Sequence, residues 1–185
     1  MTQPAEILDF WFAGEPNERR AVWFQKDDAF DAGCVAFTGA HEAAKRGELD
    51  HWVGTAEGAL ALLILLDQLS RNLHRGSPEA FAADPKARAI SSAAIARGLD
   101  RALTPVQRMF VYLPFEHSED LADQDRSVAL FETIRAALGD QTVDYAARHR
   151  DAIARFGRFP HRNAVLGRPN TSAEEAYLAE PGAGF

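Results

Sequence analysis

Apolar residues in this chain recur mostly three and four positions apart, which is the spacing of one face of an α-helix. Phe30, Cys34, Phe37 and His41 lie on one such stripe. The alternation of apolar and polar residues that marks a half-buried strand is almost absent. The pattern therefore predicts an all-α fold.

Residues that favour the first turn of a helix punctuate the chain, and they predict about eight helices. The predicted starts are Pro4, Asp27 or Asp28, Thr55, Asp84, Thr104, Ser118, Asp140 and either Thr171 or Ser172. The first helix is predicted to end at Phe12, and Pro114 predicts an end or a kink in the helix that follows Thr104. Short loops leave no room for a linker, so we expect one domain, residues 1–185, built of antiparallel helix pairs.

The helix that begins at Thr55 is predicted to lie at the centre of the core. Residues 59–66 are apolar without interruption, and a helix that is apolar on all sides needs neighbours on all sides. Cys34 shares its stripe with phenylalanines, so we expect a small core residue there rather than a nucleophile.

Composition and charge exclude several classes of partner. The 185 residues include 27 acidic and 20 basic ones, and the formal charge of −7 disfavours binding to nucleic acid and to anionic membranes. The longest apolar run is far shorter than the roughly 20 residues of a membrane-spanning helix. The single cysteine excludes an internal disulfide, and we expect a cytoplasmic protein.

A first group of polar residues follows directly on the apolar run of the central helix. Asp67, Arg71 and Arg75 are spaced by four and share one ridge, and Asn72 lies on the next. A buried guanidinium needs a carboxylate, so one interpretation is an internal pair between Asp67 and Arg71. The other is that Arg71 and Arg75 face a cleft and bind an anion.

A second group surrounds Pro114, in the sequence YLPFEHSED. Ser118, Glu119 and Asp120 have an adequate structural role as the cap and first-turn acids of the next helix. Glu116 and His117 are less easily explained in that way, because a carboxylate beside a histidine can raise its pKa for acid–base work.

A third group, RFGRFPHRN from Arg155 to Asn163, carries arginines and a histidine without one acid. Phe156 and Phe159 can anchor this loop in the core, which would fix Arg158, His161, Arg162 and Asn163 in place. The partner of these cations is either the acidic stretch 116–125, in an internal ion-pair network, or a bound anion.

We expect neither a metal ion nor another cofactor. Glu116, His117, Glu119 and Asp120 could supply ligands, but nearly consecutive positions at a proline bend cannot all converge on one ion. The nearby arginines would repel a further cation. Glycine-rich motifs that cradle phosphates are missing as well.

Three long segments give the chain a family resemblance: LLDQLSRNLHRGSPEAFAADPKA, VYLPFEHSED and RFGRFPHRNAVLGR, in this order. With them the chain resembles, almost end to end, the bacterial family known as domain of unknown function 924. The resemblance implies a single α-helical domain similar to the tetratricopeptide superhelix, although the 34-residue tetratricopeptide consensus is missing. It implies no substrate, reaction or cofactor.

The function hypothesis is a pocket for a small anion, a carboxylate or a phosphate. Its predicted lining is Asp67, Arg71, Asn72, Arg75, Glu116, His117, Arg158, His161, Arg162 and Asn163. If the ligand is hydrolysed there, the candidate catalytic groups are His117, Glu116 and His161. The alternative is a tetratricopeptide-like scaffold for a peptide or partner protein, in which the polar network is purely structural. The oligomeric state is not predicted.

Overall fold

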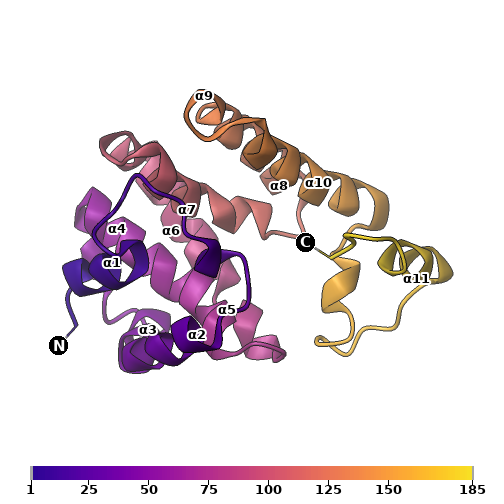
Figure 1. Ribbon diagram of the computed structural model, residues 1–185, viewed down its shortest axis with the longest axis horizontal. Helices are drawn as coiled ribbons and strands as arrows, with labels where there is room; N and C mark the ends of the chain where they lie inside the picture. The colour runs from indigo at the N-terminus through magenta and orange to yellow at the C-terminus, as the bar shows by residue number, and fades with distance from the viewer. Residues whose placement is uncertain (1, 185) are drawn as a thin grey trace. The chain divides into compact units, whose positions relative to one another are not determined.

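In the computed structural model, which describes residues 2–184, all regular secondary structure is helical (Figure 1). The predicted all-α class is therefore confirmed. Within the described range the chain divides into two compact units: unit 1 comprises residues 2–75 and 79–114, and unit 2 comprises residues 76–78 and 115–184. The single domain and the superhelical, tetratricopeptide-like arrangement remain predictions.

Unit 1 contains the first seven α-helices and several shorter helical turns. The α-helices are α1 (Pro4–Phe12), α2 (Asp28–Cys34), α3 (Thr38–Lys45), α4 (Ala56–Leu63), α5 (Ser70–Leu73), α6 (Asp84–Ala96) and α7 (Pro105–Glu116), whose last two residues belong to unit 2. A π-helical turn, η4 (Ile64–Leu69), joins α4 to α5. The 3₁₀ turns are η1 (Ala21–Trp23), η2 (Val35–Phe37), η3 (Asp50–Gly54), η5 (Pro78–Phe81), which straddles the two units, and η6 (Leu99–Ala102).

The central helix is buried as its sequence predicts. Thr55 caps α4 by accepting a hydrogen bond from the backbone N–H of Gly58, and residues 59–66 are at most 1% exposed. Cys34 is fully buried, as expected for a core residue, and burial raises the pKa of its thiol to about 12.

Unit 2 contains the remaining helices: α8 (Leu121–Glu132), α9 (Arg135–Leu138), α10 (Asp140–Phe156), α11 (Ser172–Leu178) and the 3₁₀ turn η7 (Pro160–Arg162). The longest two, α8 and α10, pack side by side (Figure 1). Phe131 of α8 and Ala146 and Ile153 of α10 are buried, together with Phe159 of the following loop.

The described residues form eleven α-helical segments where about eight helices were predicted. The difference arises because three predicted helices are interrupted: the 3₁₀ turn η2 separates α2 from α3, and η4 separates α4 from α5. The helix predicted from Ser118 to Gly139 is interrupted at residues 133–134, between α8 and α9. Pro114 does not end its helix, since α7 continues through it to Glu116.

Three predicted helix caps are wrong. Asp84 and Asp140 are the first residues of their helices, and their carboxylates accept from Arg71 and Arg135 instead of capping. Asp120, not Ser118, caps α8 through the backbone N–H groups of residues 122 and 123. The carboxylates of Asp84 and Asp140 bond to Arg71 and Arg135, and the hydroxyl of Ser118 donates to Asp123.

No helix among residues 2–184 combines the length and the apolar character that crossing a membrane requires. This finding agrees with the sequence, in which no sufficiently long apolar run occurs.

Candidate functional site

The polar residues at the end of the central helix form an internal ion-pair network in unit 1. Asp67 is fully buried in the π-helical turn η4, and Nη1 of Arg71 lies 3.1 Å from its Oδ1. The same guanidinium donates two parallel hydrogen bonds of 3.0 Å to Asp84. Burial opposes the charge of Arg71, but the two carboxylates raise its pKa above the ordinary value. The expected internal pair is thus present, with a second carboxylate that was not foreseen.

Arg75 and Asn72 converge on another carboxylate of unit 1. The Nε and Nη2 atoms of Arg75 donate to Asp31 over 2.9 to 3.1 Å, and the amide of Asn72 donates to the same carboxylate over 2.7 Å. Asp31 comes from α2, so these bonds tie α2 to the end of the central helix. All four candidate residues of unit 1 therefore belong to internal polar contacts.

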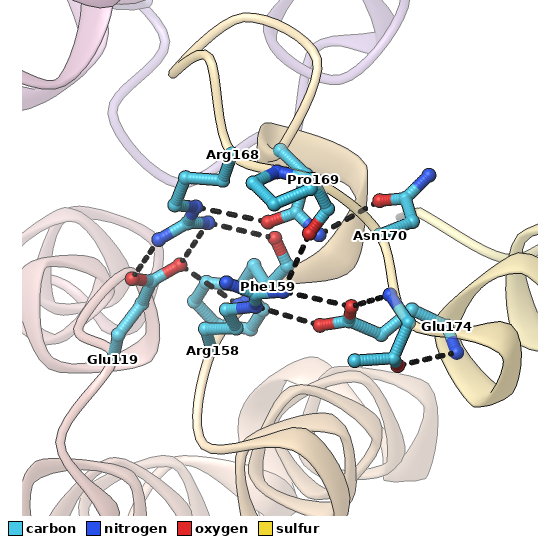
Figure 2. A network of polar contacts seen from close by, with 9 residues as sticks. Glu119, Arg158, Phe159, Arg168, Pro169, Asn170 and Glu174 are labelled. Atoms are coloured by element: carbon cyan, nitrogen blue, oxygen red, sulfur yellow. Dashed lines mark hydrogen bonds and ion pairs between the residues drawn. The ribbon is translucent and has the colours of Figure 1, made fainter.

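In unit 2, a network of ion pairs and hydrogen bonds, which we call the frame, holds the loop between α10 and α11 in place (Figure 2). Nη1 and Nη2 of Arg168 donate to the two oxygens of Glu119 over 2.7 and 2.9 Å, and the backbone N–H of Phe159 donates to the same carboxylate over 2.8 Å. Nη2 of Arg168 also donates to the Phe159 carbonyl oxygen. The acidic stretch thus supplies an ion-pair partner for the basic loop. The residues that form this pair are Glu119 and Arg168, which are not among the predicted lining residues.

Arg158 and Asn163 complete this frame through hydrogen bonds to other residues of unit 2. Arg158 donates two hydrogen bonds of 2.7 and 2.8 Å to Glu174, and a third to the carbonyl oxygen of Pro169. Asn163 accepts from Arg168 and donates to Asn170. Glu174 is also part of the capping box of α11 with Thr171, so a single carboxylate fixes both the helix and the loop.

Within this frame, the ring of Phe159 is surrounded by two imidazole rings and one guanidinium group. Phe159 is fully buried, and the guanidinium of Arg162 lies 4.5 Å from its ring centroid. The imidazoles of His149 and His161 lie 5.6 and 5.4 Å from the same centroid. Arg162 and His149 are themselves 7% and 5% exposed. A positive charge is thereby held in the interior of unit 2 on an aromatic face.

Glu116 and His117, at the end of α7, belong to the same neighbourhood. Glu116 is 3% exposed, and its Oε1 lies 3.5 Å from Nδ1 of His149, which also faces the Tyr145 carbonyl oxygen at 2.9 Å. His117 contributes to the electrostatic environment of both other histidines. We name Glu116, His117, His149, His161 and Arg162 the histidine cluster.

The histidine cluster holds its buried imidazoles in the neutral form. Burial is the largest cause of a fall in the pKa of His149 to about 3 and of His161 to about 4. The positive charge of Arg162 lowers both values further, and Glu119 opposes this for His161. At neutral pH the cluster therefore contains Arg162 as a fixed cation beside the neutral rings of His149 and His161, which can donate and accept hydrogen bonds, and beside the Glu116 carboxyl group.

The ten predicted lining residues thus fall into two sets. Asp67, Arg71, Asn72 and Arg75 lie in unit 1, whereas Glu116, His117, Arg158, His161, Arg162 and Asn163 lie in unit 2. His149 is not among the predicted lining residues. The sequence pattern does distinguish this position, because His149 interrupts the buried apolar face of α10 that Ala146 and Ile153 otherwise form.

A cavity of about 230 Å³ lies elsewhere in unit 2, between α10 and the segment that follows α11. Its lining includes Arg148, Arg155, Tyr177 and Glu180. Both signs of charge occur in it, and Arg155 stacks on the rings of Phe156 and Tyr177. It offers a second location for an anion, which any binding experiment has to distinguish from the histidine cluster.

Comparison with known proteins identifies relatives but no function. A family model described as a bacterial protein of unknown function, DUF924, matches residues 7–182. A solved structure of a protein of unknown function from Agrobacterium tumefaciens is 46% identical, covers 95% of this chain and 96% of its own, and superposes with a TM-score of 0.86. No curated protein matches the chain.

Proposed function

The chain belongs to the DUF924 family of bacterial proteins of unknown function, and from its own geometry we propose that the histidine cluster of unit 2 binds a small anion, a carboxylate or a phosphate. Arg162 supplies the charge for this binding. His149 and His161 supply hydrogen bonds from neutral rings, and Glu116 orients His149.

The observation that carries the proposal is the electrostatic effect of Arg162 on its neighbours. Arg162 is 7% exposed, and its charge adds to the effect of burial, the largest cause, in lowering the pKa of both His149 and His161. A buried positive charge thus lies close to both imidazole rings, in a protein whose formal charge is −7. A small anion is attracted by such a charge, whereas a second cation is repelled.

The other arginines support the proposal by their structural roles. Arg158 and Arg168 each form a two-point ion pair with a carboxylate of unit 2 and so hold the loop that carries His161 and Arg162. Because this loop is fixed at both ends, the cluster is formed before a ligand arrives, and less conformational entropy is lost on binding.

The protonation states limit the chemistry that the cluster can perform. A histidine with a pKa of about 4 is neutral at pH 7, so His161 is not protonated there to act as a general acid, and its lowered pKa makes it only a weak general base. If a bound ester is hydrolysed, the first step assigned to His161 is therefore to take a proton from the attacking water. Binding itself does not depend on this step.

Thermal unfolding in the presence of inorganic phosphate or acetate tests the proposal. An anion at 100 times its dissociation constant stabilises the folded protein by about 2.7 kcal/mol, which corresponds to a rise in Tm of roughly 5 to 10 °C for a chain of this size. We expect the Arg162→Gln variant to lose the shift and the Arg162→Lys variant to retain a smaller one.

The matched control is Arg155→Gln, which removes a cation from the separate cavity. We expect its anion response to equal that of the wild type. An anion response that is lost in Arg155→Gln and kept in Arg162→Gln places the anion in the cavity and contradicts the proposal. No response of the wild-type protein to either anion also contradicts it, and leaves the peptide-binding scaffold as the remaining hypothesis.

A further inference from the structure

Two histidines and a glutamate of unit 1 lie outside the proposed anion site and come from two segments that are distant in sequence. Their ligand atoms all lie within 4.8 Å of one another. His41 and Glu42 are neighbours on α3, and His74 directly follows α5. The packing of α3 against η4 brings the two segments together. The His41 and His74 ring centroids are 5.4 Å apart.

His41 is buried in an unusual way for a polar side chain. It is fully buried, and neither of its ring nitrogens forms a hydrogen bond of good geometry, although Nδ1 lies 3.4 Å from Oε1 of Glu42. The buried Nε2 atom of His74 has none either. Buried polar atoms in folded proteins are nearly always satisfied, and a missing ion is one of the few explanations for a group that is not.

From this geometry we propose that His41, Glu42 and His74 bind a divalent transition-metal ion, with zinc as the ion that the donor set fits best. Two imidazoles and one carboxylate are borderline ligands that suit zinc and, less well, cobalt or nickel. Three protein ligands leave the fourth position of a tetrahedral ion for water or another ligand.

The distances are close to those that a tetrahedral ion requires. With metal–ligand bonds of about 2.1 Å, two ligands of a tetrahedral ion are about 3.4 Å apart. Nδ1 of His41 already lies 3.4 Å from Oε1 of Glu42. Side-chain rotation of His74 and Glu42 supplies the remaining approach, and the Glu42 side chain is 41% exposed and so has room to move.

Lys45 is the main competitor for the proposed ion. Its Nζ lies 3.3 Å from Oε1 of Glu42 and 3.3 Å from Oε2 of Glu79. Metal binding replaces the contact of Lys45 with Glu42, and the contact with Glu79 keeps the ammonium partnered. The Lys45→Gln variant removes this competing cation and provides a change that should tighten binding.

The expectation of no metal ion rests on the residues around position 117, and His41, Glu42 and His74 lie outside that stretch. No motif joins His41 to His74, because they are 33 positions apart in the chain and become neighbours only where the end of the central helix packs beside α3. A search for consecutive ligand spacings could not have found the group.

The experiment is a titration of the full chain, freed of metal by a chelator and of any histidine tag, with Zn²⁺ by calorimetry and with Co²⁺ by visible absorption. We expect one equivalent of Zn²⁺ per chain and the intense visible bands of four-coordinate cobalt. We further expect Glu42→Gln and His74→Gln to weaken binding at least tenfold, and Lys45→Gln to strengthen it several-fold.

His51→Gln is the matched control, since His51 is exposed and outside the group. It should bind the metal as the wild type does. The proposal is overturned if the wild type takes up no stoichiometric metal, or if folded Glu42→Gln and His74→Gln bind with wild-type affinity. If either variant fails to fold by circular dichroism, an unchanged affinity in Lys45→Gln overturns the proposal instead.

Discussion

Glu119 and Arg168, 49 residues apart in the chain, form a two-point ion pair with N–O distances of 2.7 and 2.9 Å. The same carboxylate accepts from the backbone N–H of Phe159, on whose ring Arg162 rests. One glutamate just before α8 therefore fixes both ends of the loop that carries the proposed anion-binding cation.

Replacing Glu119 with glutamine should destabilise the fold by about 2 to 3 kcal/mol, because a charge-assisted pair and part of the Phe159 contact are lost while the Arg168 guanidinium stays partly buried. Urea unfolding at neutral pH measures the change. Glu48→Gln, which removes an ion pair on the exposed surface, should leave the free energy of unfolding unchanged. Equal effects of the two variants would show that Glu119 has no special structural role.

The buried histidines should make the fold sensitive to acid. The pKa values of about 3 for His149 and about 4 for His161 lie below the ordinary value of 6.5, so the unfolded chain binds protons more readily than the folded one between those values. Stability should therefore fall as the pH is lowered from about 6.5 towards 4. Two protons correspond to a slope of at most about 2.7 kcal/mol per pH unit.

Unfolding of the His161→Gln variant over the same pH range isolates one of these protons. Its slope should be shallower than that of the wild type by roughly one proton. Burial alone would raise the pKa of Glu119, but the hydrogen bonds from Arg168 and Phe159 hold it below its usual range, so its share of the stability is lost only at lower pH, as the carboxylate protonates. A wild-type stability that is flat between pH 7 and 5 would contradict neutral burial of the histidines.

Arg71→Lys should destabilise unit 1 by about 3 kcal/mol, because a lysine cannot reproduce the two parallel bonds to Asp84 while it faces Asp67. Chemical denaturation measures the loss. The anion-induced rise in Tm should persist in this variant, since Arg71 is assigned a structural role. Loss of the anion response in a folded Arg71→Lys protein would mean that Arg71 takes part in anion binding.

Cys34 should resist alkylation in the native protein. Its thiol is fully buried, and a pKa of about 12 leaves almost no thiolate at pH 8. A maleimide should label it only after denaturation, as mass spectrometry can establish. Rapid stoichiometric labelling of the folded protein would mean that the α2 region opens locally or that the thiol is accessible.

Short-range patterns predicted the fold well where the partner of a residue lies within one helical turn. Thr104 with Gln107 and Thr171 with Glu174 form the capping boxes that their spacing indicates. The burial of the central helix could also be predicted, because a helix that is apolar on all sides must be buried, whichever elements surround it.

Predictions failed where a polar side chain has a competing partner that is distant in sequence. Asp84 bonds to Arg71 and Glu119 to Arg168, and neither choice can be derived from local spacing. The same limit applies to the candidate sites. Phe159 could be expected to anchor its loop, but its contact with His149 depends on how α10 packs against that loop.

The most direct test of the proposed function is a pH titration of the histidine rings by nuclear magnetic resonance, with and without inorganic phosphate. Without phosphate, His149 and His161 should stay neutral well below pH 6, while exposed His51 serves as the internal reference. A phosphate bound beside Arg162 stabilises the protonated rings, so it should shift both resonances and raise both pKa values by roughly one unit. Resonances of His149 and His161 that ignore phosphate in the folded protein, or that respond equally in Arg162→Gln, would contradict the anion site.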